Sequence, residues 1–276
     1  MQNSPLKMAV LMACIYAGQA SAAPLFQIGV DNNLAFQAVG NKTGGTSIAV
    51  GDTLYGVVNL QDISSGTTTW GADNVAPVYD SFSGYFLSRV VSITSVTVPS
   101  VGTFSSVKMG VATSDPNGIF SAADLAAGTI MKMYTDTTTP YTTSGPIGTD
   151  ISKATDGTLW ASLGFSGGGF WDLSVNPSGY GTSSSNGGLN LITNSTGLSW
   201  SKVGADQSPG CPSGGCLVDM KFVSTFSPTS SGAWQVNIND PAVMHPVPVP
   251  AAALLLGSGL AGFAGISIRK GRKLSG

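Results

Sequence analysis

The stretch Trp234–Asn239 reads WQVNIN, and apolar and polar side chains alternate along it without a break. Successive side chains of a strand point to opposite faces, so the three apolar residues would share a buried face and the polar ones would meet water. The upstream stretch Val218–Phe222, VDMKF, repeats this alternation. Together the two stretches predict neighbouring antiparallel strands in a sheet with one wet face.

Shorter β-patterned runs occupy most of the chain between residues 47 and 203, and Gly, Pro, Asn and Asp turns separate them. One short helix is expected where Ser121 can cap the first turn, Asp124 favours the helix dipole and Gly128 can end the helix. Thr135–Asp150 is expected to be a loop, and the Gly/Ser-rich residues 178–188 a mobile segment. The pattern predicts an all-β ectodomain of one domain, an antiparallel β-sandwich or jelly-roll-like fold with one short helix.

Composition supports an exported β protein and argues against binding to nucleic acid. Charged residues make up 9% of the chain, against a typical share of about 25%. All 14 acidic residues are Asp, and the absence of Glu removes a good helix former. The ectodomain holds all of these Asp but only seven scattered Lys and Arg residues, so it is acidic and lacks the basic patch that phosphate binding needs.

The N-terminus has the three parts of a secretory signal peptide. Lys7 supplies the basic region, Met8–Ala17 the apolar region, and Ala20-Ser21-Ala22 the small residues of a cleavage site. We therefore expect cleavage between Ala22 and Ala23, which assigns residues 1–22 to the signal peptide and residues 23–245 to the ectodomain. Lipidation of Cys14 is a weaker alternative, because the apolar run before it is short.

The C-terminal region predicts a membrane anchor. Residues 251–268 form an apolar run without charge, and a helix of that length would reach about 27 Å, enough to cross a bilayer core. A basic stop follows it and should stay on the cytoplasmic side. This stop consists of Arg269, Lys270, Arg272 and Lys273.

The order of a short Pro motif, an apolar helix and a basic stub resembles the PEP-CTERM sorting signal. The motif here is Val247-Pro248-Val249-Pro250, followed by Ala251, and it is most similar to the variant that reads Val-Pro-Leu-Pro-Ala. The resemblance assigns residues 246–276 to a sorting signal. It implies that an exosortase, a membrane processing enzyme, recognises Val247, Pro248, Val249 and Pro250 and cleaves nearby. A plain C-terminal anchor without processing is the alternative.

Two cysteines remain after removal of the signal peptide. Cys211 and Cys216 enclose a Pro- and Gly-containing loop, and an even number of cysteines in an exported domain favours a structural disulfide. A redox-active pair is the less favoured interpretation, because such pairs usually have two intervening residues.

The sequence assigns no catalytic residue, metal or cofactor. His245 is the one histidine, and it lies beside the expected anchor. Gly164–Gly168 matches the pattern of a hydrolase elbow with Ser166 as nucleophile, but a β-patterned run follows where a helix is required. Asp31–Asn33 and Asp115–Gly118 carry oxygen ligands of the kind that Ca²⁺ binds, yet neither completes a calcium loop, and Asx turns are expected.

Three hypotheses of function remain from the sequence. The first is a non-enzymatic surface or extracellular-matrix protein, held in the inner membrane as an intermediate and then sorted to the cell surface or the medium. The second is a carbohydrate-binding module of the polysaccharide matrix that uses exposed tryptophans among Trp160, Trp171 and Trp234. The third, a glycoside hydrolase, would need two converging Asp residues.

Overall fold

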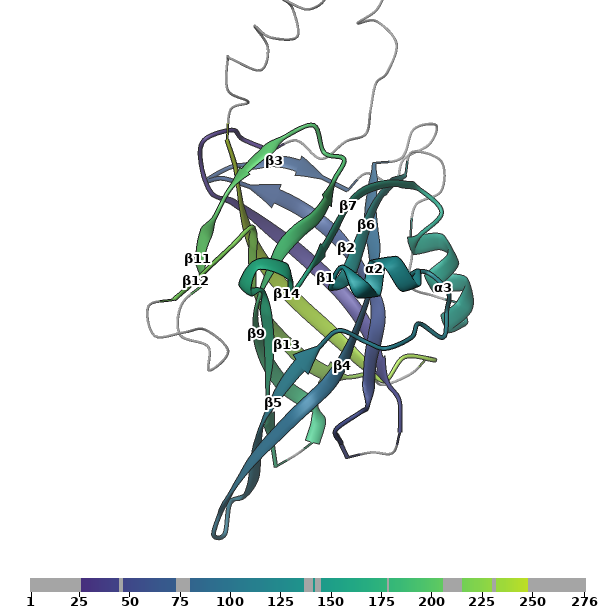
Figure 1. Ribbon diagram of the computed structural model, residues 1–276, viewed down its shortest axis with the longest axis vertical. Helices are drawn as coiled ribbons and strands as arrows, with labels where there is room; N and C mark the ends of the chain where they lie inside the picture. Colours follow the sequence, from purple (N-terminus) through teal and green to yellow (C-terminus); the bar gives the residue numbers. More distant parts are fainter. Residues whose placement is uncertain are drawn as a thin grey trace, which may run out of the picture.

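The computed structural model describes residues 26–44, 47–72, 80–136, 141, 145–177, 179–205, 215–229 and 232–247 (Figure 1). The expected signal peptide, the expected membrane helix 251–268 and the expected basic stop lie outside these ranges. Neither α-helix of the described ranges has the length and apolarity that a bilayer crossing requires.

Strands dominate the described chain. Their bounds are β1 Asn32–Lys42, β2 Thr53–Ser64, β3 Thr68–Gly71, β4 Ser81–Val98, β5 Gly102–Gly110, β6 Thr129–Asp136, β7 Thr158–Gly164, β8 Phe170–Asn176, β9 Gly179–Asn194, β10 Ser199–Ser201, β11 Val203–Ala205, β12 Cys216–Val218, β13 Met220–Pro228 and β14 Val236–Val247. The helices are α2 Ala122–Ala126 and α3 Ile147–Ala154, and a short 3-10 turn spans Ser166–Gly168.

A 12-stranded antiparallel sheet carries the fold and closes on itself. Neighbouring strands run β2-β1-β14-β13-β9-β7-β6-β4, and β4 then pairs with β2 to complete the ring. Closure depends on the register in which Thr53 faces Arg89 and Asn59 faces Ser83. The strands of the ring therefore have hydrogen-bonded neighbours on both sides.

Two long strands continue beyond this ring. The C-terminal half of β4 leaves β2 and β6 and pairs with β5, while β9 also pairs with β8. Because β5 pairs with β8, these strands close a second loop of pairing at one end of the molecule. The tip of the β4–β5 hairpin projects well beyond the ring (Figure 1).

The core has an inner and an outer part. The inner core fills the closed sheet and includes Leu34, Phe82 and Leu163. The outer core lies against the outside of β2 and β4, where α3 packs on both strands and Tyr85 contacts Phe120. Asp150 links α3 to the outer core, because its buried carboxylate accepts a hydrogen bond of 2.8 Å from the indole of Trp234.

The predicted all-β antiparallel class is confirmed, and three finer expectations are corrected. Twelve of the fourteen described strands form one continuous closed sheet, while β11 and β12 pair only with each other. The main core therefore lies inside the closed sheet and not between two stacked sheets. The expected helix forms as α2, with the Ser121–Asp124 capping box. A second helix, α3, starts after Pro146 inside the expected loop, where Gly148 and Thr149 are poor helix formers and packing on the sheet decides the outcome.

The Gly/Ser-rich segment is the third correction, since its described residues belong to strand β9. Its glycines make room for neighbouring side chains. A Cβ on Gly187 would lie 2.0 Å from Cζ of Phe222 on the adjacent strand, so the aromatic ring occupies the space that a side chain would take. Composition alone therefore indicates flexibility where close packing is the physical reason for the glycine.

We predict that Gly187→Ala destabilises the protein by ~1–3 kcal/mol, because the added methyl group must displace the Phe222 ring in a packed core. The midpoint of thermal or urea unfolding measures this loss. Gly204→Ala is the matched control, because a Cβ there meets no atom within 4 Å. Equal stability of the two variants would contradict the packing role of Gly187.

Candidate functional site

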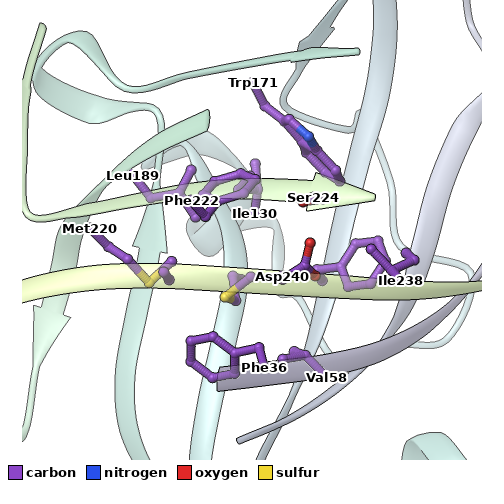
Figure 2. Close-up of a pocket in the computed structure, with 13 residues that line it drawn as sticks. Phe36, Val58, Ile130, Trp171, Leu189, Met220, Phe222, Ser224, Ile238 and Asp240 are labelled. Atoms are coloured by element: carbon purple, nitrogen blue, oxygen red, sulfur yellow. The ribbon is translucent and has the colours of Figure 1, made fainter. Parts of the chain in front are cut away.

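Two hollows of the described structure are lined by polar groups that lack protein partners. One is a small cavity inside the closed sheet, shown in Figure 2. The other is a groove on the outer face of β13, β14, β1 and β2. Their sizes and linings differ, and these differences decide what each can hold.

The interior cavity is apolar except for one group of side chains. Asp240 points into it from β14 and Ser224 from the neighbouring β13, among Phe36, Ile130 and other apolar residues (Figure 2). Phe222 faces Ala242 and Thr225 faces Asn239, which places Ser224 opposite Asp240.

The polar row continues onto β9, where Ser185 faces Ser224. The side chains of Ser185 and Ser224 are almost completely buried, as is the indole of Trp171 near the same cavity. Asp240 is half-buried as a residue, but its Oδ1 atom is buried. Four polar atoms of this region make no hydrogen bond of normal geometry within the described residues. They are Ser185 Oγ, Ser224 Oγ, Trp171 Nε1 and Asp240 Oδ1.

Burial raises the pKa of Asp240 from its ordinary value of 3.8 to about 7, and the nearby Ser224 hydroxyl offsets part of this rise. The physical cause is the loss of hydration of the charged carboxylate in an apolar interior. The carboxyl group therefore changes its charge near neutral pH.

The cavity measures about 30 Å³, which exceeds the minimum of about 10–15 Å³ that a buried water molecule needs. A water molecule there would have several polar partners, which is what buried water requires. An organic substrate does not fit. The interior row therefore has room only for water beside the carboxyl group of Asp240.

The outer groove has a volume of about 580 Å³, within the usual range of small-molecule sites of about 300–1,000 Å³. Its polar floor follows the strand register, in which Thr225 faces Asn239, Asn239 faces Gln37 and Gln37 faces Asn59. Asn237, Ser227 and Gln61 lie beside this row. All of these side chains are amides or hydroxyls, and no lining residue of the groove is charged.

Tyr141 lines the same groove, and it also packs in the outer core next to α3. Its hydroxyl group and Asn59 Oδ1 are buried and have no partner among the described residues. Burial raises the pKa of Tyr141, and the nearby Asp150 carboxylate raises it further. The phenol therefore keeps its proton and can donate a hydrogen bond.

The three tryptophans on which the carbohydrate-binding hypothesis depended do not form an exposed surface. Trp160, Trp171 and Trp234 are 7%, 5% and 6% exposed, so all three belong to the two cores. Their large apolar area is better used in packing than in contact with water. A sugar-stacking face made of these residues is therefore excluded.

The structure does not give Ser166 the setting of a hydrolase nucleophile. Ser166 starts an exposed 3-10 turn that joins β7 to β8, so a strand follows where the elbow requires a helix. His245 Nδ1 lies instead 2.8 Å from Asp31 Oδ1.

Asp115–Gly118 forms a turn, whereas Asp31–Asn33 leads into β1, with Asn32 closing the turn before it. Asp115 Oδ2 accepts hydrogen bonds of 2.8 and 2.9 Å from the backbone of Ile119 and Phe120. Asn32 donates to the backbone carbonyl oxygens of Gln27 and Val30. In the part of the chain that the structure describes, no group of three or more His, Cys or Asp residues is placed to hold a metal ion.

Most residues of the expected sorting and processing sites lie outside the described ranges. These are Ala22, Ala23, Pro248, Val249, Pro250, Arg269, Lys270, Arg272 and Lys273. Val247 is described, and it ends β14 opposite Ser199 of β10. Cys216 is buried at the start of β12, while Cys211 is outside the described residues, so the Cys211–Cys216 disulfide stays a prediction.

Sequence reasoning missed both the interior row and the outer groove. The sequence contained a local indication of the inward position of Asp240, because this carboxylate follows Val236 and Ile238 at the same spacing of two residues. The groove had a weaker one in the run of outward amides, Gln37, Asn237 and Asn239. Only the strand order brings Gln37 beside residues that follow it by some 200 positions.

Comparison of the chain with protein-family models, curated proteins and solved structures gives no match.

We predict that stability falls as the pH rises from about 4 to 7, by up to ~1.4 kcal/mol per pH unit, through Asp240. Its pKa is higher in the folded protein than in the unfolded chain. The folded state thus binds the extra proton in this range, and stability is lost as that proton leaves. Asp240→Asn should remove this part of the slope in urea unfolding measured across the range.

Ser185→Ala is the control, because it removes a polar neighbour and keeps the carboxyl group. It should retain the pH dependence of the wild type. If Asp240→Asn left the slope unchanged, titration of the buried carboxyl group would be ruled out as its cause.

Proposed function

We propose that this chain is an exported surface or extracellular-matrix protein with a structural or interaction role, sorted through its C-terminal signal by an exosortase. The observation that carries the proposal is the order of Val247-Pro248-Val249-Pro250, an uncharged 18-residue run and a basic stop, coupled to a signal peptide. In this proposal the signal peptide directs export, residues 251–268 span the membrane until processing, and the ectodomain is released to the cell surface or the medium.

The fold supports this division of the chain. β14 runs to Val247 and pairs there with β10, and the backbone of Gly29 donates a hydrogen bond of 2.7 Å to the carbonyl oxygen of Pro246. The described β structure thus reaches the first residue of the motif. A processing enzyme acting just beyond Val247 would separate the tail and leave β14 in place.

A carbohydrate-binding module is the second candidate, and the outer groove favours it. Uncharged amide and hydroxyl side chains line this groove. A glycoside hydrolase has less support, because no Asp lies among the residues that line the groove, and that chemistry needs a pair of carboxyl groups.

The test is the mass of the mature protein isolated from its native cells. The wild type should lack residues 1–22 and the tail that follows the motif. A variant with Pro248→Ala and Pro250→Ala should keep its tail, because the enzyme would no longer recognise the motif. The same variant should accumulate in the inner membrane.

Pro116→Ala is a matched control, because it replaces an exposed turn proline far from the tail in sequence. It should be processed like the wild type. An intact C-terminus in both the wild type and the motif variant would refute sorting by cleavage and favour a plain anchor.

A further inference from the structure

We propose that the outer groove binds an uncharged polysaccharide chain through its amide and hydroxyl side chains. This inference rests on the proposed surface or matrix role, and it names the class of partner. It does not use the tryptophans of the sequence hypothesis, and its polar side chains come from four adjacent strands.

The side chains of the groove have unused hydrogen-bonding capacity. Within the described ranges, the side chains of Gln37, Gln61, Asn237 and Asn239 make no hydrogen bond to the protein. Each amide offers a carbonyl acceptor and two N–H donors. Sugar hydroxyls both donate and accept, so adjacent hydroxyl groups of a sugar match the two ends of an amide.

The polar groups of the groove form a line across the sheet. Thr225, Asn239, Gln37 and Asn59 stand in one row across β13, β14, β1 and β2. Neighbouring strands are about 4.8 Å apart, so the row extends over roughly 14 Å. That length suits several consecutive sugar units of a chain lying across the strands. Val39 adds an apolar contact for the C–H faces of the sugar rings.

The lining of the groove also contains buried polar atoms without protein partners among the described residues. Tyr141 is 3% exposed, and its hydroxyl group has no partner within the described residues. Asn59 Oδ1, from the lining of the same groove, is also buried and has no hydrogen-bond partner within the described residues. A buried polar atom without a partner costs about 1–3 kcal/mol. A small adjustment of these side chains towards a bound hydroxyl group would recover part of that cost.

The lining excludes other classes of partner. An anionic polymer would find no cation among the lining residues, and the ectodomain is acidic. A peptide strand would need a free sheet edge to add to. The strands below the groove are paired on both sides, since β1 lies between β2 and β14 and β14 between β1 and β13. What remains is a polar, uncharged chain that binds through its side groups.

The experiment is affinity electrophoresis of the purified full-length protein in gels that contain dextran, soluble starch, hydroxyethyl cellulose or the anionic polymer alginate. At least one of the neutral polymers should retard the wild type. Salt up to about 0.5 M should leave this retardation unchanged, because no charge is involved. The double variant Gln37→Ala/Asn239→Ala should lose at least tenfold in affinity for that polymer.

Asn186→Ala is the matched control, because Asn186 is an exposed strand amide that lies outside the groove. It should bind like the wild type, and thermal unfolding should show that both variants are folded. The proposal is overturned if no neutral polymer retards the wild type, if only alginate does, or if the control loses as much affinity as the double variant. Tail processing is measured separately by mass, so failure of binding and failure of sorting are distinguishable.

Discussion

Pairing of β2 with β4 is the constraint on which the rest of the molecule depends. Without it the sheet would be an open ribbon with two exposed edges, and unpaired edge groups favour association with other chains. With it, Leu54, Phe82 and Leu163 become parts of one interior. The second closure through β5 and β8 uses the same two long strands, β4 and β9. The fold is thus built on strands that are long enough to serve two sets of partners.

Closure of the sheet also places the polar residues of its strands in two different environments, one inside and one outside. Inward-facing polar residues, such as Asp240 and Ser224, line a small and mostly apolar cavity, where burying a charge is the dominant cost. Outward-facing amides on the same strands lie in a hollow large enough for a ligand. Asp240 and Asn239 are adjacent in sequence, yet they take part in these two different environments, because side chains alternate across a strand.

The last described strand, β14, ends at Val247, which is also the first residue of the proposed sorting motif. The last strand, β14, pairs with β1 and β13 along most of its length and with β10 near its end. This pairing ties the residues before the motif into the sheet. The proposed division of labour is then a rigid β domain that meets the matrix and a tail that is read by the membrane enzyme.

The sequence by itself determined the β class, because Trp234–Asn239 has a strict period of two, and buried and exposed residues alternate along its β14 part. The predicted strand Val218–Phe222 is divided instead, since β12 ends at Val218, β13 begins at Met220 and Asp219 between them is buried. It also determined helix α2, whose capping box is local. Tertiary structure decided the rest. It formed α3 against the sheet despite poor helix formers, and it made a strand of the Gly-rich segment, because Phe222 fills the space over Gly187. It also brought Gln37 beside Asn239. Register and closure depend on contacts between distant residues, and a local pattern carries no information about which strands will be neighbours.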